Sequence, residues 1–171
     1  MSKALTKKQV QEFNKDGFLY PVEAYSEQEA KQLHDKFVGM ENKLGHEPQV
    51  KFRIKAHLPF PWLCDVVRNE KLLNAVEDIL GPNILCWGGS FFTKKPDDRT
   101  FVSWHQDSNY WGLSGGEVLT AWVALSPATR LSGAMKAVRG SHRGPNLRHV
   151  ETYHPDNLSL IHISEPTRRY A

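Results

Sequence analysis

Cysteine and long apolar runs are both scarce in this sequence. Cys64 and Cys86 are the only cysteines among 171 residues, and they form no CxxC pair. This usage is typical of reduced structural thiols, so we expect a cytoplasmic protein. No apolar run approaches the roughly 20 residues that a membrane helix needs. The first residues, MSKALTKKQVQEF, contain no apolar stretch of the secretory type, so we expect neither a signal peptide nor a membrane partner.

A strong charge of either sign is also missing. The chain has 22 Lys and Arg against 19 Asp and Glu, a formal net charge of +3. The basic residues are scattered rather than arranged in a stripe, so we expect no nucleic-acid partner. The length suggests one domain. A domain of this size can bury roughly 70% of its unfolded surface, which is enough for a core.

Three capped helices are predicted in the first half of the chain. Thr6 is a suitable N-cap for a helix that runs to about Lys15, where Asp16-Gly17 would end it. Ser26 with Glu29 forms a capping-box pattern at the start of a second helix. A third helix is predicted to begin after Asn69 and to end at Gly81-Pro82. Between them, residues 39–62 contain glycines and prolines at a density typical of loops.

The second half of the chain has sequence patterns that predict strands. Alternating or β-rich patterns occur at residues 18–22, 51–55, 83–95, 117–125 and 134–138, and His105 is expected early in a further strand. The Gly88-Gly89 pair inside one of these segments indicates a bulge or a close backbone approach. Helices followed by strands favour an α+β protein with a β-sandwich core.

The most informative stretch is Ser103-Trp104-His105-Gln106-Asp107, followed by Tyr110 and Trp111. Alternate residues of an extended strand point the same way, so His105 and Asp107 are expected on one face. An imidazole and a carboxylate on one face suit non-haem Fe(II), whose usual protein ligands are two His and one carboxylate. A solvated polar pair is the alternative, but an exposed polar strand rarely carries so many large aromatic side chains.

Three motifs in order carry a family resemblance: WHQD at 104–107, TAWVAL at 120–125 and SGAMKAVRGSHRG at 132–144. Together they resemble the phytanoyl-CoA dioxygenase family, over most of residues 5–157. Members are oxygenases that depend on Fe(II) and 2-oxoglutarate and adopt a double-stranded β-helix, or jelly roll. The resemblance implies a jelly-roll core behind N-terminal helices, which would be incomplete at the C-terminus of this chain.

The resemblance also implies roles for single residues. His105 and Asp107 match the iron ligands, with the second ring nitrogen of His105 held by another group. Trp122, Phe91 and Lys95 match the wall of the 2-oxoglutarate pocket, although a core position for Trp122 and a surface position for Lys95 are the alternatives. Gln106 and Tyr110 are candidates for contact with the substrate. A carboxylate at Asp107 is typical of hydroxylases, because halogenating relatives have a small residue there.

The last residues depart from the family pattern. The family adds strands that bring a second iron-binding His and an Arg for the far carboxylate of 2-oxoglutarate. Residues 158–171 contain His162 and two arginines, but they resemble translated adapter sequence. We therefore interpret residues 1–157 as one partial oxygenase domain and 158–171 as a non-native or disordered tail. His142, in the Gly-Ser-His turn, is expected to be structural rather than the second ligand.

The implied reaction couples oxidative decarboxylation of 2-oxoglutarate to hydroxylation of an unactivated C–H bond in a small organic substrate, with O₂ as oxidant. We expect the 171-residue chain itself to be nearly inactive. One alternative is a non-catalytic jelly-roll protein that binds a small molecule, which would be expected to lack the His-x-Asp pair. Another is a cupin-type metalloenzyme, which would carry an HxH cluster. No pattern in the sequence selects the substrate.

Overall fold

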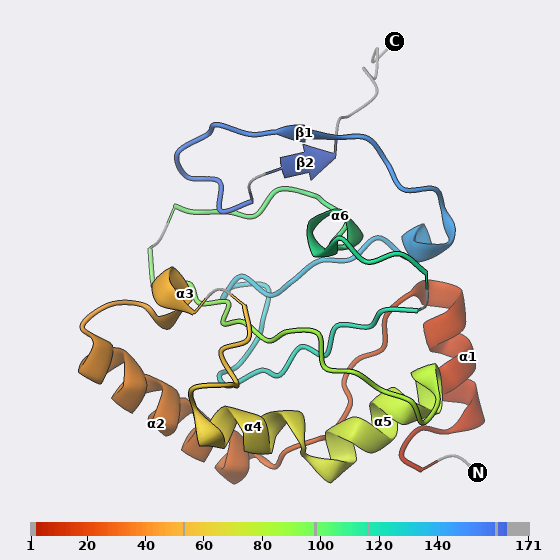
Figure 1. The fold of residues 1–171 in the computed structure, drawn as a ribbon, viewed down its shortest axis with the longest axis horizontal. Helices are drawn as coiled ribbons and strands as arrows, with labels where there is room; N and C mark the ends of the chain where they lie inside the picture. Colours follow the sequence, from red (N-terminus) through yellow and green to blue (C-terminus); the bar gives the residue numbers. More distant parts are fainter. Residues whose placement is uncertain (1–2, 53, 98, 116, 160, 164–171) are drawn as a thin grey trace. The chain divides into compact units, whose positions relative to one another are not determined.

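The computed structural model of the chain describes residues 3–52, 54–97, 99–115, 117–159 and 161–163 (Figure 1). The chain divides into two compact units. The first contains Met1–Thr93 and Glu117–Ser141, and the second contains Lys94–Gly116 and His142–Ala171. The predicted metal-binding segment therefore belongs to the second unit, and the N-terminal helices belong to the first.

Helix α1, Lys7–Asp16, begins and ends where the sequence predicts. The Thr6 hydroxyl accepts a hydrogen bond from the Gln9 amide at 3.2 Å, and the Gln9 side chain accepts one from the Thr6 amide at 2.9 Å. This reciprocal pair satisfies two amide groups that would otherwise have no partner in the first turn. At the other end Gly17 has φ 84°, a left-handed conformation that glycine adopts without a Cβ penalty.

Helices α2, Glu27–Leu44, and α5, Glu70–Leu80, also confirm their predicted caps. Ser26 and Glu29 form a capping box at the start of α2, and Asn69 accepts from the Leu72 amide at 2.9 Å at the start of α5. Two shorter helices follow: α3, Pro48–Lys51, lies within residues 39–62, which were predicted to be loop, and α4, Pro61–Val67, begins at the end of that segment. Each has proline in its first turn, where the missing N–H costs no helical hydrogen bond.

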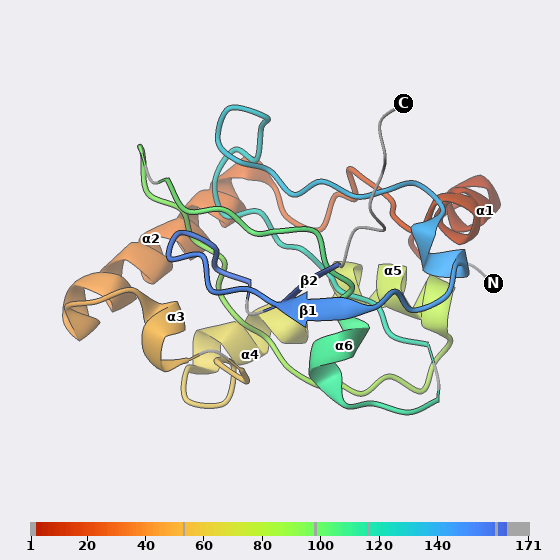
Figure 2. The ribbon, with the colours of Figure 1, turned by 90° about the horizontal axis from the view of Figure 1, so that it is seen from above.

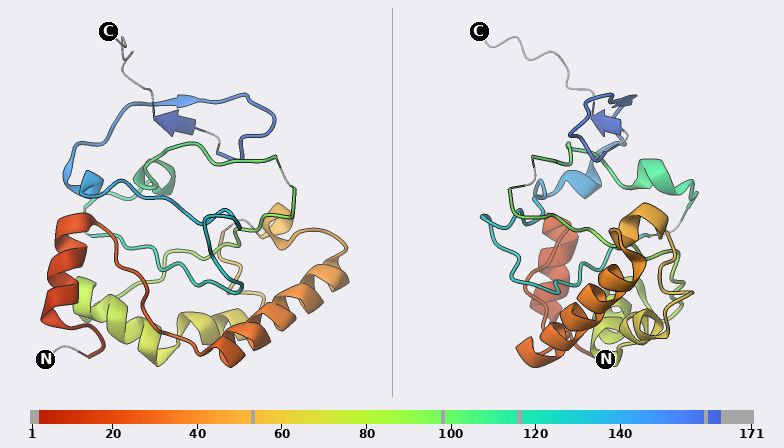
Figure 3. Two further views of the ribbon diagram at one scale, coloured as in Figure 1. Left: turned by 180° about the vertical axis from the view of Figure 1, so that it is seen from behind. Right: turned by 90° about the vertical axis from the view of Figure 1, so that its left-hand side faces the viewer.

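The buried core of the first unit is small and lies mainly along α2, the longest helix in Figure 3. The buried apolar side chains are Leu5, Leu33, Phe37, Met40, Ala56 and Ala75, and Pro48 is fully buried. Phe91 adds its ring to this cluster, 5.2 Å from the ring of Phe37 and 6.3 Å from that of Trp62. The spacing of Leu33 and Phe37, four residues apart, places both on the same face of α2.

The strand predictions are largely wrong for the described residues. They contain two short strands, β1 at His149–Glu151 and β2 at Ile161–Ile163, which pair antiparallel with Val150 opposite His162 (Figure 2). Outside this pair, one isolated parallel bridge joins Phe101 to Asn157. Residues 18–22, 83–95, 117–125 and 134–138 form no paired strand where they are described, and Lys51 ends α3. The mixed α and β content is confirmed in part, whereas a sandwich of paired strands is not formed by these residues.

The segments predicted as strands lack the neighbours that a strand needs, and their exposed side chains show this. A strand requires a neighbour for its backbone groups and, on at least one face, a partner for its apolar side chains. Instead, Leu85 is 86% exposed and Phe92 is 59% exposed. The close approach predicted at Gly88-Gly89 does occur, because the Ala56 amide donates to the Gly89 carbonyl at 3.0 Å. That contact is with an irregular segment, so it does not extend into a sheet.

Two predicted absences can be compared with the structure. Within the described part of the chain, no helix has both the length and the apolar composition for a membrane span. Cys64 and Cys86 are both free, and the Cys64 thiol donates to the His57 carbonyl at 2.9 Å.

Candidate metal centre

His105 and Asp107 meet, although not in the way that a strand would bring them together. Asp107 has φ −55° and ψ −34°, a helical conformation, and it precedes the single-turn helix α6, Ser108–Trp111. The strand prediction is therefore wrong at this residue. The turn folds the carboxylate back toward the imidazole, so that His105 Nε2 and Asp107 Oδ1 lie 2.9 Å apart. Convergence arises from a local turn rather than from alternation along a strand.

The other ring nitrogen of His105 is held by the backbone. Nδ1 lies 2.8 Å from the carbonyl oxygen of Ser103, which accepts a hydrogen bond from it. The ring of Tyr110 approaches the imidazole edge-on, with centroids 5.5 Å apart and an interplanar angle of 87°. The side chain of His105 is 21% exposed and that of Asp107 is 49% exposed. The imidazole is thus fixed on two sides, and the carboxylate faces solvent.

These contacts determine which species can occupy the gap between the two side chains. With its Nδ1 proton donated to Ser103, neutral His105 presents a lone pair on Nε2, and ionised Asp107 presents another on Oδ1. Two lone pairs at this distance require a cation between them, which is a proton or a metal ion. The hydrogen bond to Asp107 raises the pKa of His105 above its ordinary value of 6.5, while partial burial opposes the rise.

The pair has the spacing of two neighbouring metal ligands. Two ligands about 2.1 Å from one ion and at a right angle to each other lie about 3.0 Å apart. The observed separation of 2.9 Å is close to this value. A backbone carbonyl on the remote ring nitrogen is also the usual support for a metal-binding histidine. Among the side chains that the structure describes, however, no third His, Cys, Asp or Glu joins the pair to form a group that could hold a metal ion.

Sequence reasoning missed the residues that hold the peptide between the two candidate ligands. His149 Nε2 accepts a hydrogen bond from the Gln106 amide at 2.9 Å, and the Gln106 side chain accepts one from the Leu147 amide at 2.7 Å. Gln106 Nε2 donates to the Pro145 carbonyl at 3.4 Å. No motif marks His149 in the sequence, since it lies more than forty residues from the pair.

The candidates for the cosubstrate pocket do not belong to a single unit. Phe91 and Trp122 are in the first unit, whereas Lys95 is in the second, where it is exposed. Phe91 packs on the helices through Phe37, and the ring of Trp122 instead neighbours that of Phe92, with centroids 5.8 Å apart. Trp122 is 45% exposed, so the alternative of a plain core tryptophan does not describe it.

Tyr110, predicted to contact substrate, and the tail residues Ser159 and His162 all belong to the second unit. The Tyr110 hydroxyl lies 2.7 Å from the hydroxyl of Ser159, which is 6% exposed. His162 belongs to strand β2 through its backbone, and its side chain lies outside the described residues. The tail residues 164–171 also lie outside them.

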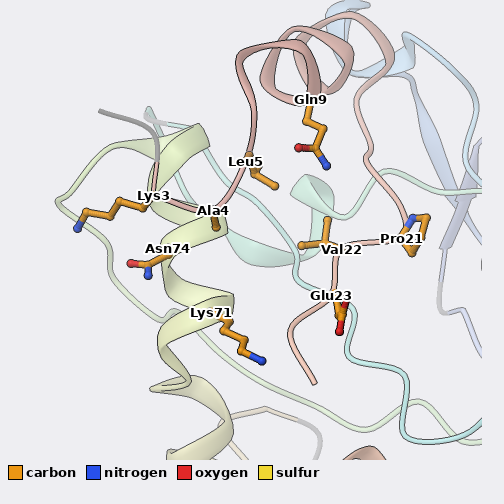
Figure 4. A pocket seen from close by; sticks show the side chains of 9 residues that line it. All are labelled: Lys3, Ala4, Leu5, Gln9, Pro21, Val22, Glu23, Lys71 and Asn74. Carbon is orange, nitrogen blue, oxygen red and sulfur yellow. The ribbon is translucent and has the colours of Figure 1, made fainter. Parts of the chain in front are cut away.

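A cavity of about 440 Å³ lies in the first unit, between α1 and α5 (Figure 4). Its lining mixes the apolar Leu5, Pro21 and Val22 with the polar Gln9, Glu23, Lys71 and Asn74, and includes Lys3 and Ala4. None of the predicted metal or cosubstrate residues lines it. The cavity is therefore not the site that the sequence predicts.

The family is established by comparison with known proteins. The sequence profile of the phytanoyl-CoA dioxygenase family matches residues 13–165. Because this match covers most of the chain, the protein belongs to that family. The match continues beyond Asn157, where the sequence analysis placed the end of the native domain. No solved structure matches the chain significantly.

Individual relatives are named for different substrates. The chain is 31% identical over 115 residues to a "Probable alpha-ketoglutarate-dependent hypophosphite dioxygenase" of Stutzerimonas stutzeri, covering 66% of this chain and 40% of that protein. It is 27% identical over 155 residues to an "Ectoine dioxygenase" of Bordetella parapertussis, covering 82% of this chain and 50% of that protein. A "Probable phytanoyl-CoA dioxygenase" of Caenorhabditis elegans is 27% identical over 96 residues, covering 52% of this chain and 31% of that protein. The chain spans half the length, or less, of these curated relatives.

Proposed function

We propose that this protein is a dioxygenase dependent on Fe(II) and 2-oxoglutarate, which hydroxylates an unactivated C–H bond of a small organic substrate with O₂. The observation that carries the proposal is the pairing of an imidazole with a carboxylate: His105 Nε2 and Asp107 Oδ1 lie 2.9 Å apart, and the Ser103 carbonyl holds the other ring nitrogen. Family membership supports it, as do relatives named as alpha-ketoglutarate-dependent and as dioxygenases.

His105 and Asp107 would hold the iron. The Ser103 carbonyl keeps the Nδ1 proton of His105 in place, so that Nε2 is free to bind a cation. Asp107 supplies a negative charge that stabilises a divalent ion and leaves no gap for a halide ligand. When bound, Fe(II) would supply the activation of O₂ and the oxidative decarboxylation of 2-oxoglutarate. The ring of Tyr110 packs perpendicular to the imidazole, with centroids 5.5 Å apart.

The cosubstrate roles of Trp122, Phe91 and Lys95 remain part of the proposal. Trp122 is supported by its exposed ring, which leaves a face available to a ligand. Phe91 is supported less, because its ring already packs on Phe37 and Trp62. For Gln106, the hydrogen bonds to the backbone of residues 145 and 147 favour a structural role over contact with substrate.

We also propose that the jelly-roll core and the remaining ligands require sequence beyond the described residues. The segments at 83–95 and 117–125 have the sequence pattern of strands, and they expose apolar side chains that a second sheet would cover. The strands of that second sheet would bring the third protein ligand and the arginine that binds 2-oxoglutarate. His162 is the alternative third ligand, since its strand pairs with β1 in the same unit as the metal pair.

One experiment tests this function and separates the two sources of the third ligand. The 171-residue chain, its His162→Ala variant and a chain continued from Asn157 with the genomic sequence are assayed for Fe(II)-dependent succinate release from 2-oxoglutarate. We expect turnover only from the continued chain, with loss of turnover on His105→Ala. Turnover by the 171-residue chain that disappears in His162→Ala would assign the ligand to His162. No turnover from any chain would contradict the proposed function.

The structure supports no single substrate. The relatives' printed names cover hypophosphite, ectoine and phytanoyl-CoA, which share neither charge nor size. The proposal therefore names only a small organic molecule as substrate, with O₂ as the oxidant.

A further inference from the structure

The peptide between His105 and Asp107 is attached to a distant segment of the same unit. The Gln106 amide donates to His149 Nε2 at 2.9 Å, and His149 Nδ1 in turn donates to the Leu147 carbonyl at 2.8 Å. The second bond fixes the tautomer of His149, since a ring nitrogen that accepts must be unprotonated. His149 therefore holds the peptide unit that joins His105 to Gln106, the first of the two peptide units between His105 and Asp107.

Side-chain amides fasten the same two segments together. The amides of Asn109 and Asn146 exchange two hydrogen bonds, at 2.9 and 3.1 Å. Gln106 Oε1 accepts from the Leu147 amide at 2.7 Å. Several hydrogen bonds thus connect the turn that carries Asp107 to residues 145–149. Among them, the bond to His149 comes from the backbone between the two candidate ligands.

A second attachment lies on the other side of His105. Asn157 Oδ1 accepts from the amides of Ser103 and Ser159, at 3.2 and 3.0 Å. Its Nδ2 donates to the hydroxyls of Ser103 and Thr152, at 2.9 and 3.3 Å. Ser103 is the residue whose carbonyl holds His105 Nδ1. Asn157 therefore holds the backbone amide and the hydroxyl of the residue whose carbonyl orients the imidazole.

We infer that His149 and Asn157 are positioning residues, which hold His105 opposite Asp107 before any metal ion binds. The inference rests on the proposed role of the pair as iron ligands. Neither residue touches the donor atoms Nε2 of His105 or Oδ1 of Asp107 in the hydrogen bonds described, so both act through the backbone. Partners of this kind set ligand geometry, and their loss commonly costs about 10–100-fold in metal affinity.

The first test needs no metal. In the ¹⁵N-labelled 171-residue chain, an N–H···N hydrogen bond gives a scalar coupling between the Gln106 and His149 nitrogens. We expect this coupling in the wild type and its loss in His149→Ala. We also expect the His105 ring resonances to shift in His149→Ala, because the imidazole is then no longer fixed relative to the neighbouring ring of Tyr110. His46→Ala, at an exposed histidine of the first unit, should leave both signals unchanged.

The second test compares two substitutions at Asn157. Asn157→Asp keeps the oxygen that accepts from the Ser103 amide, whereas Asn157→Leu removes it. We expect the His105 ring resonances to move in the leucine variant and to stay near wild type in the aspartate variant. Unchanged His105 ring resonances in Asn157→Leu would contradict the positioning role of Asn157.

The third test measures Co(II) affinity by visible absorption, with the signal of His105→Ala subtracted as background. We expect His149→Ala to bind Co(II) about 10-fold to 100-fold more weakly than the wild type. If the wild type takes up no Co(II), the proposed iron site fails in this chain, and the positioning role is then decided by the metal-free spectra. Absence of the Gln106–His149 coupling in the wild type overturns the inference, as do unchanged His105 resonances or unchanged Co(II) affinity in His149→Ala.

Discussion

The helical region from residue 6 to 81 and the region from 83 to 138 differ in how their backbone groups find partners. Each main helix of the first region closes its own hydrogen bonds and carries its caps within four residues of its ends. The second region is rich in β-type patterns, yet its described residues form no paired strand apart from the single bridge at Phe101. Local patterns are sufficient for helices, whereas strands depend on neighbours far along the chain.

The largest expected effect is on the free energy of unfolding, and it compares a buried leucine of the first region with an exposed leucine of the second. Leu33, on α2, is 9% exposed, whereas Leu131, in the turn after residue 126, is 100% exposed. Leu33→Ala should lower the free energy of unfolding by about 2–5 kcal/mol, because it leaves a cavity in a small core. Leu131→Ala should change it by about 0.5 kcal/mol or less. Urea denaturation monitored by circular dichroism measures both, and equal losses would show that the core is not centred on α2.

The next effect concerns the local turn that brings the metal pair together. Asp107→Ala removes one of the two proposed ligands, so Co(II) affinity should fall by at least about 10-fold. In a catalytically complete version of the protein, hydroxylation should be lost, and chloride should be able to occupy the vacated position. Asp65→Ala, at an exposed carboxylate on α4, is the matched control and should bind the metal normally. Unchanged turnover and product in Asp107→Ala would show that Asp107 is not a ligand.

A smaller effect compares two serine hydroxyls that bond to nearby amides. Ser26 accepts from the Glu29 amide at 3.3 Å at the start of α2, and Ser132 accepts from the Thr129 amide at 2.7 Å within an exposed turn. Ser26→Ala should lower the free energy of unfolding by about 1 kcal/mol, the usual cost of a lost cap. Ser132→Ala should have a smaller effect, since the turn buries no core residue. Thermal unfolding of the two variants measures the difference, and an equal or larger loss in Ser132→Ala would contradict this comparison.

The smallest effect is the pH dependence of His105. Because the hydrogen bond to Asp107 raises its pKa, protonated His105 contributes stability below the ordinary value of 6.5, and this contribution is lost as pH rises through the raised value. Metal binding has the opposite dependence, since the ion must displace that proton. NMR titration of the His105 ring measures the pKa, which should fall toward its ordinary value in Asp107→Asn. An unchanged pKa in that variant would mean that the Asp107 contact is not its main cause.

The sequence by itself determined the three capped helices of this protein, α1, α2 and α5. Thr6, Ser26 and Asn69 were identified as caps, and Gly17 and Gly81 as ends, because capping chemistry involves residues within a few positions of one another. It also identified the family and the two candidate iron ligands, since each of the three motifs is a continuous run of residues.

Only the tertiary structure decided how that pair is held. The sequence predicted a strand through His105 and Asp107, but a turn at Asp107 brings the carboxylate to the imidazole. His149 and Asn157 lie more than forty residues away, and their contacts to Gln106 and Ser103 depend on the path of the chain between them. No local rule encodes such contacts, because a hydrogen bond to a backbone amide places little constraint on the type of residue that accepts it.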